Sequence, residues 1–114
     1  MDIDFSYFNE VTFGDKMLML ELIDIFEKQI PEIVNDLKNA LNEKNYKKIA
    51  SIAHKAKSSV AVFGMKKWEK ALKDLQISIE KGEIPENLDT FILEFQKEAY
   101  ETIKIYKEYV DKQN

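Results

Sequence analysis

The sequence predicts an all-α protein, an up-and-down antiparallel four-helix bundle with a short additional N-terminal helix. Apolar residues recur at helical spacing along almost the whole chain, and no stretch alternates as a strand would. The chain has 114 residues, of which 45% are hydrophobic, and only three Gly and two Pro. This size and composition fit one domain over residues 1–114. Short connections between its helices favour antiparallel neighbours.

The first two elements are separated by a break at Gly14. An aromatic segment with Phe5 and Phe8 is expected to form the short helix, and Asp15 is expected to cap the long helix that follows. Apolar residues of that long helix recur at Leu18, Leu22, Ile25, Phe26, Ile33, Leu37 and Leu41. Pro31 lies inside the pattern and costs about 3 kcal/mol in a helix interior, so we expect a kink or a break there.

Three more helices follow, and Asn45 is the expected N-cap of the first. Their expected core positions are Ile49, Ile52, Ala53, Ala56, Val60 and Phe63; then Met65, Trp68, Leu72, Leu75 and Ile79; then Leu88, Phe91, Phe95, Ala99, Ile103, Tyr106 and Val110. Gly64 and Gly82 follow the first and second of these series, as helix-ending glycines do. The aromatic side chains, including Trp68 and Phe95, are assigned to packing.

Composition excludes several classes of function. The net charge is −4 and every one of the 17 cationic side chains is Lys, which argues against nucleic-acid binding. The chain has no Cys, so disulfides, thiolate nucleophiles and cysteine zinc sites are excluded. Neither a membrane span nor a signal peptide is apparent, and we expect a cytoplasmic protein that does not bind membranes.

His54 is the only histidine of the chain. With a rotation of about 100° per residue, His54 projects about 160° from the core direction marked by Ala56, and therefore points outward. The side chains expected on this outer face, mostly small and flanked by lysines, are Lys47, Ala50, Ser51, Lys57, Ser58 and Ala61. We interpret the face as a docking surface and predict that Ala50, Ser51, Ser58 and Ala61 contact a partner.

An exposed imidazole with an ordinary pKa of about 6.5 is largely neutral and nucleophilic near neutral pH, so it can accept a phosphoryl group. Lys57, three residues after His54, lies on the adjacent stripe of the same helix, where its ammonium can stabilise the phosphoryl oxygens. The chain supplies a nucleophile and a cation but no metal and no cofactor. A partner must therefore complete the chemistry.

The stretch from Ala53 to Gly64 resembles the signature of histidine-containing phosphotransfer (HPt) domains of two-component phosphorelays. Its pattern, Ala-His-x-x-Lys-Gly followed by small residues and an apolar-Gly pair, matches at His54, Lys57, Ser59 and Phe63-Gly64. The Gly-Asp pair, Phe26 and Pro31 extend the resemblance to roughly residues 5–112. The chain departs from the pattern at Ser58, where the family usually has Gly, and this puts partner choice in question.

The resemblance implies that His54 accepts a phosphoryl group from a receiver-domain aspartate and passes it to another receiver domain. The implied partners are response-regulator receiver domains, a hybrid sensor histidine kinase, or both, with Mg²⁺ bound by the receiver. The protein would be a monomeric phosphoryl carrier without independent enzymatic turnover.

Other interpretations remain open. The chain could be a scaffold that binds receivers without relaying phosphate, or an HPt domain excised from a larger sensor kinase. A lone histidine can also be an incidental surface residue. A di-iron bundle is excluded because Ser51, not Glu, stands three residues before the only histidine, and a haem bundle because His54 points outward. No Gly-rich phosphate loop or Ser-His-Asp set indicates an independent enzyme.

Overall fold

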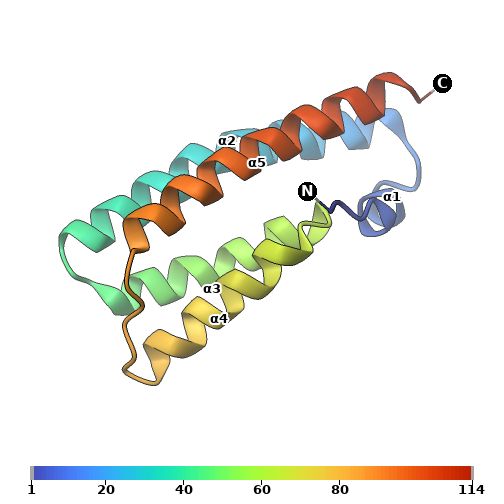
Figure 1. The fold of residues 1–114 in the computed structure, drawn as a ribbon. Helices are drawn as coiled ribbons and strands as arrows, with labels where there is room; N and C mark the ends of the chain where they lie inside the picture. The colour runs from blue at the N-terminus through green and yellow to red at the C-terminus, as the bar shows by residue number, and fades with distance from the viewer. Residues whose placement is uncertain (1, 114) are drawn as a thin grey trace.

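The computed structural model describes residues 2–113, and within them every regular element is a helix. The five helices are α1 (Ser6–Thr12), α2 (Lys16–Asn42), α3 (Tyr46–Val62), α4 (Lys66–Glu80) and α5 (Leu88–Asp111). α2 packs mainly with α5 and α3 with α4, while the short α1 lies near one end (Figure 1). The all-α prediction is therefore confirmed for the described residues. None of these helices is long and apolar enough to cross a membrane.

Two predicted N-caps set where the long helices begin. The Asp15 carboxylate accepts hydrogen bonds from the backbone N–H groups of Met17, at 2.8 Å, and Leu18, at 3.3 Å. The Asn45 side-chain oxygen accepts one from the backbone N–H of Lys48 at 3.1 Å. These side chains satisfy donors that the first turn of a helix leaves without partners.

The long helix α2 passes through Pro31 without interruption, so of the two predicted outcomes, a kink or a break, the break is wrong. Pro31 is exposed, whereas Ile30 and Val34 on either side of it are buried. Proline removes only one backbone hydrogen bond. Burial of the flanking apolar side chains is sufficient to hold the helix together across that gap.

The apolar residues of α2 form two stripes. The buried stripe consists of Met19, Ile23, Phe26, Ile30, Val34, Leu37 and Ala40. Leu18 and Ile25, which belong to the predicted apolar series, are 38% and 50% exposed. The neighbouring helices α3 and α5 cover only the first stripe. The second stripe remains as apolar surface.

A cluster of aromatic side chains holds the C-terminal end of α3. The fully buried Tyr106 donates a hydrogen bond from its hydroxyl to the Phe63 carbonyl oxygen at 2.6 Å. Burial raises the pKa of Tyr106 above its ordinary value, so the hydroxyl keeps the proton that it donates. The Phe63 ring stacks on Phe26 with centroids 4.5 Å apart. The helix that carries His54 is thus anchored to α2 and α5.

Gly64 ends α3, as predicted, and also makes room for the N-terminal segment. It has a φ of +62°, and the Asp4 N–H donates to its carbonyl oxygen at 3.2 Å. A Cβ added at Gly64 would collide with the Asp4 backbone, whereas one added at Gly82, which has a φ of +81°, would meet nothing. Gly64 therefore has a steric role that Gly82 lacks.

This difference predicts the effects of two matched substitutions. Gly82→Ala should cost about 1–2 kcal/mol of unfolding free energy, because only backbone strain is introduced. Gly64→Ala should cost at least about 1 kcal/mol more, because the N-terminal segment must also move. Urea denaturation followed by circular dichroism measures both. Equal losses would show that the close approach of Asp4 to Gly64 contributes nothing to stability.

Candidate functional site

His54 lies on the exposed side of α3, opposite the residues that this helix buries. The buried residues of α3 are Ile49, Ala50, Ala53, Ala56 and Val60. Because a helix can bury only one face against its neighbours, burial of Ala53 and Ala56 directs the side chain of His54 outward. The imidazole is therefore accessible to a second protein.

The predicted docking residues do not all share this exposure. Ser51 and Ser58 are exposed, and Ala61 is half-buried. Ala50 is only 6% exposed, so its predicted place on the outer face is wrong. The physical reason is that α4 packs along the side of α3 on which Ala50 lies, and covers it. No hydrogen bond joins the Ser58 hydroxyl to the ring among the side-chain bonds of residues 2–113.

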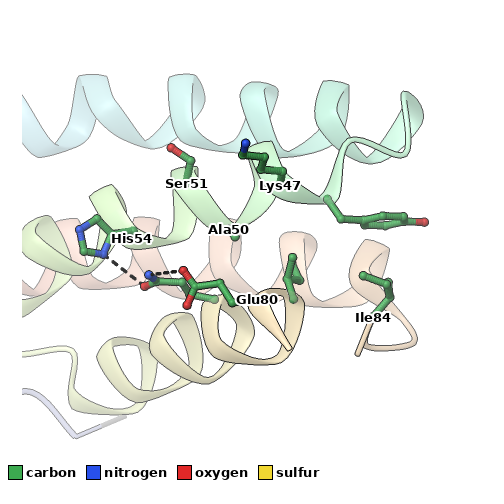
Figure 2. Close-up of a pocket in the computed structure, with 9 residues that line it drawn as sticks. Lys47, Ala50, Ser51, His54, Glu80 and Ile84 are labelled. Atoms are coloured by element: carbon green, nitrogen blue, oxygen red, sulfur yellow. Dashed lines mark hydrogen bonds between the residues drawn. The ribbon is translucent and has the colours of Figure 1, made fainter. Parts of the chain in front are cut away.

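A groove of about 480 Å³ runs between α3 and α4, with His54 among its lining residues (Figure 2). Its lining consists of Tyr46, Lys47, Ala50, Ser51, His54, Gln76, Ile79, Glu80 and Ile84. Ala50 is the short side chain on α3 that faces this groove. The groove therefore places polar side chains of α4 beside the ring of His54.

Gln76 of α4 is the direct partner of the histidine. Its Oε1 lies 3.2 Å from Nδ1 of His54, and a carbonyl oxygen can only accept a hydrogen bond. In a neutral ring, this orientation of the Gln76 amide favours the tautomer with the proton on Nδ1 and the lone pair on Nε2.

Sequence reasoning missed Gln76, although a signal for it exists. Gln76 follows the buried Leu72 by four residues and precedes the half-buried Ile79 by three. A polar residue at such a position borders the core stripe and faces a neighbouring helix. Nothing in that spacing identifies α3, or His54, as what it meets.

α3 is the most uniformly basic part of an acidic protein. It contains no Asp or Glu, and its charged residues other than the histidine are Lys47, Lys48, Lys55 and Lys57. All the ion pairs formed among residues 2–113 involve lysines of other helices. Glu80 on α4 and Glu32 and Asp36 on α2 line the hollows on the two flanks of α3. The outward positive charge of α3 is thus largely available to an anionic ligand.

On its other side, α3 meets α2 at an apolar surface. Leu22 and Ile25 of α2 and Ser58 and Val62 of α3 line a shared hollow there, which we call the α2–α3 patch. Nearby, the Ser59 hydroxyl donates to Gln29 Oε1 of α2 at 2.9 Å and joins the two helices. Ser58 lies one helical turn after His54, so the patch adjoins the histidine.

The site is not arranged as a metal centre. Among residues 2–113, no group of three or more His, Asp or Glu side chains could hold a metal ion. What the described side chains provide is an exposed imidazole with a hydrogen-bond partner on Nδ1 and a half-buried lysine three residues later.

Comparison with known proteins assigns the chain to a family. The model of the Hpt domain matches residues 21–103, a segment that includes His54, Lys57 and Gln76. No significant match is found among curated proteins or among solved structures. The family match covers well over half of the chain and agrees with the motif around His54. The protein is therefore a member of the Hpt domain family, whose members carry phosphoryl groups in phosphorelay signalling.

Proposed function

We propose that this protein accepts a phosphoryl group on Nε2 of His54 from a receiver-domain aspartate and passes it to the aspartate of another receiver domain. The observation that carries the proposal is the hydrogen bond between His54 Nδ1 and Gln76 Oε1, at 3.2 Å, on an exposed helix face. In a neutral ring, that bond favours the tautomer whose lone pair is on Nε2, and the side chain is exposed. An incidental surface histidine would not need a partner that selects its tautomer.

The proposed phosphoryl transfer accounts for every bond and proton without an added base. The Nε2 lone pair attacks the phosphorus of the aspartyl phosphate, and the bond from phosphorus to the aspartate oxygen breaks as its electron pair returns to the carboxylate. The ring becomes a phosphorylated imidazolium whose remaining proton stays on Nδ1, hydrogen-bonded to Gln76. Transfer to the next receiver reverses these steps. The positive ring is a good leaving group because Nε2 departs as neutral imidazole.

Lys57 is proposed to stabilise the phosphoryl group. It follows His54 by three residues on the same helix, which places its ammonium within reach of the phosphoryl oxygens. The side chain is half-buried and forms no ion pair among the described residues. Its charge is therefore not neutralised before the phosphoryl group arrives.

The partner is proposed to supply the remaining parts of the active site. Phosphoryl transfer depends on positioning and on neutralisation of charge, and a receiver domain would bring the Mg²⁺ and the aspartate. The protein would then act as a monomeric carrier in the cytoplasm, without turnover of its own. The short connections 43–45, 63–65 and 81–87 support an up-and-down antiparallel arrangement of α2 to α5.

Receiver docking is proposed to use the lysines of α3 together with the α2–α3 patch. Ile25 exposes half of its side chain there, and the patch adjoins Ser58, one turn from His54. An acidic receiver surface would be attracted by the lysines and would cover the apolar residues. Because relay partners must separate after transfer, we expect a small interface, one that buries a total of about 1,200 Å² or less of the two surfaces.

The proposal is tested by incubating the protein with a panel of receiver domains phosphorylated by acetyl phosphate, in the presence of Mg²⁺. Wild type should gain acid-labile, base-stable phosphate, and His54→Gln should gain none. Because His54 is exposed, the free energy of unfolding of this variant should lie within about 0.5 kcal/mol of the wild-type value. If no receiver labels the wild type, the protein would be a receiver-binding scaffold, which gel filtration with the same receivers would detect. If His54 is labelled only when an ATP-binding kinase domain is joined to this protein, the protein would be a piece of a larger kinase.

Lys57→Ala should slow transfer, or shorten the lifetime of the phosphohistidine, by roughly 3- to 30-fold, because one charge-assisted hydrogen bond is lost. Lys55→Ala is the matched control, since it removes the same charge from an exposed neighbouring position. Quenched-flow labelling and decay of the isolated phosphoprotein measure the two quantities. Equal effects of the two variants would mean that Lys57 contributes only general charge.

Ile25→Asn should weaken the transfer-competent complex by roughly 5- to 10-fold, because about half of an apolar side chain is no longer buried by the receiver. Leu93→Asn on α5 is the control, since Leu93 is 58% exposed and lines a different hollow with Asp89 and Asn42. The dependence of the transfer rate on receiver concentration gives the apparent affinity. A larger loss for Leu93→Asn would place the docking surface elsewhere.

A further inference from the structure

The Gln76 side chain is hydrogen-bonded at both ends of its amide. Its Oε1 accepts from Nδ1 of His54, and its Nε2 donates to the Glu80 carboxylate, each at 3.2 Å (Figure 2). Gln76 and Glu80 are four residues apart, so they face the same side of α4. The three side chains form a chain of hydrogen bonds along the groove between α3 and α4.

An amide in this place has two orientations with opposite consequences. With Oε1 toward the ring, His54 must donate from Nδ1, and Nε2 is the nucleophile. With the amide turned over, its NH₂ group would donate to Nδ1, the ring proton would move to Nε2, and Nε2 would lose its lone pair. The ring cannot select between these orientations by itself, because a neutral imidazole offers both a donor and an acceptor.

The Glu80 carboxylate can make that selection. A carboxylate only accepts hydrogen bonds, so it pairs with the amide NH₂ group and repels the amide oxygen. Glu80 forms no ion pair among residues 2–113, although Lys47 lines the same groove. Its acceptor oxygen Oε2 therefore serves Gln76.

We propose that Glu80 is a positioning residue: through the Gln76 amide it keeps the ring proton of His54 on Nδ1 and so makes Nε2 the phosphoryl-accepting atom. The importance of this for catalysis rests on the proposed phosphotransfer function, but the effect on the tautomer does not. Glu80 does not touch the phosphoryl group in this scheme. Its influence travels only through the orientation of one amide.

Glu80→Lys is the sharpest variant, because an ammonium only donates and should turn the Gln76 amide over. Glu80 is exposed at the last position of α4, where a lysine is favourable to the helix, so the variant should fold normally. In alkaline solution the ring is neutral, and long-range ¹H–¹⁵N NMR of the only histidine reports its tautomer directly. Wild type should be mainly Nδ1–H, Glu80→Lys mainly Nε2–H, and Glu80→Ala intermediate.

Two controls separate this mechanism from a general effect of charge. Glu83→Lys makes the same change of charge three residues later, outside the lining of the groove, and should leave the tautomer as in wild type. In Gln76→Glu the side chain between His54 and residue 80 is a carboxylate. A carboxylate only accepts hydrogen bonds, so it has no second orientation in which it could donate to the ring. Adding Glu80→Lys to Gln76→Glu should therefore not shift the tautomer, whereas a purely electrostatic or structural effect of the lysine would persist.

The chemical consequence is measured with potassium phosphoramidate, a small phosphoryl donor that needs no protein partner. Glu80→Lys should be labelled at His54 at least about threefold more slowly than wild type, in step with its loss of the Nδ1–H form. Glu83→Lys should be labelled at the wild-type rate.

The same tautomer in wild type, Glu80→Ala and Glu80→Lys would overturn the inference, even if receivers still transferred phosphate to His54. The expected tautomer shifts together with no transfer from any receiver would instead overturn the proposed function and leave the role of Glu80 standing. An equal shift in Glu83→Lys, or a shift that persists in the double variant, would also overturn it.

Discussion

The functional site depends on the rotational setting of α3. Burial of Ile49, Ala53, Ala56 and Val60 leaves the helix one stable orientation, in which His54 faces outward. The cap at Asn45 fixes the N-terminal end of α3, and the aromatic cluster around Phe63 fixes its C-terminal end. A turn of the helix by one position would bury a polar ring and expose core side chains. The outward position of His54 is therefore a consequence of the core.

The same packing brings α4 close enough to act on the ring. Ala50 has a side chain short enough to be covered by α4, and the groove beside it places Gln76 within 3.2 Å of His54. His54 and its hydrogen-bond partner Gln76 thus come from different helices. Buried apolar residues and accessible polar residues alternate along each helix, because its two faces meet different surroundings.

In the proposed docking surface, α3 would supply charge and α2 would supply apolar contact area. α3 carries lysines without acidic residues, and α2 presents an apolar stripe that its neighbours leave uncovered. Charges attract an acidic partner over a distance of about 10 Å, whereas apolar surface contributes only on contact. A site of this kind favours fast encounter and modest affinity, as a relay requires.

Local signals in the sequence were sufficient for the helices, the caps at Asp15 and Asn45, the end of α3 at Gly64 and the outward direction of His54. Each depends on the rotation of one helix or on a side chain within a few residues. The predicted break at Pro31 was wrong because the energy that holds α2 together comes from buried residues, which no local rule counts. Ala50 was misplaced, and Leu18 and Ile25 are exposed members of the apolar series, because periodicity does not say how wide a face the neighbouring helices cover.

By itself, then, the sequence determined the class of fold and the motif that contains His54 and Lys57, because the motif lies within a single helix. Only the tertiary structure decided which ring nitrogen of His54 meets a hydrogen-bond partner. That choice depends on an amide from a second helix, 22 residues further along the chain. Hydrogen bonds between helices are set by packing distances, and a one-dimensional pattern does not contain them.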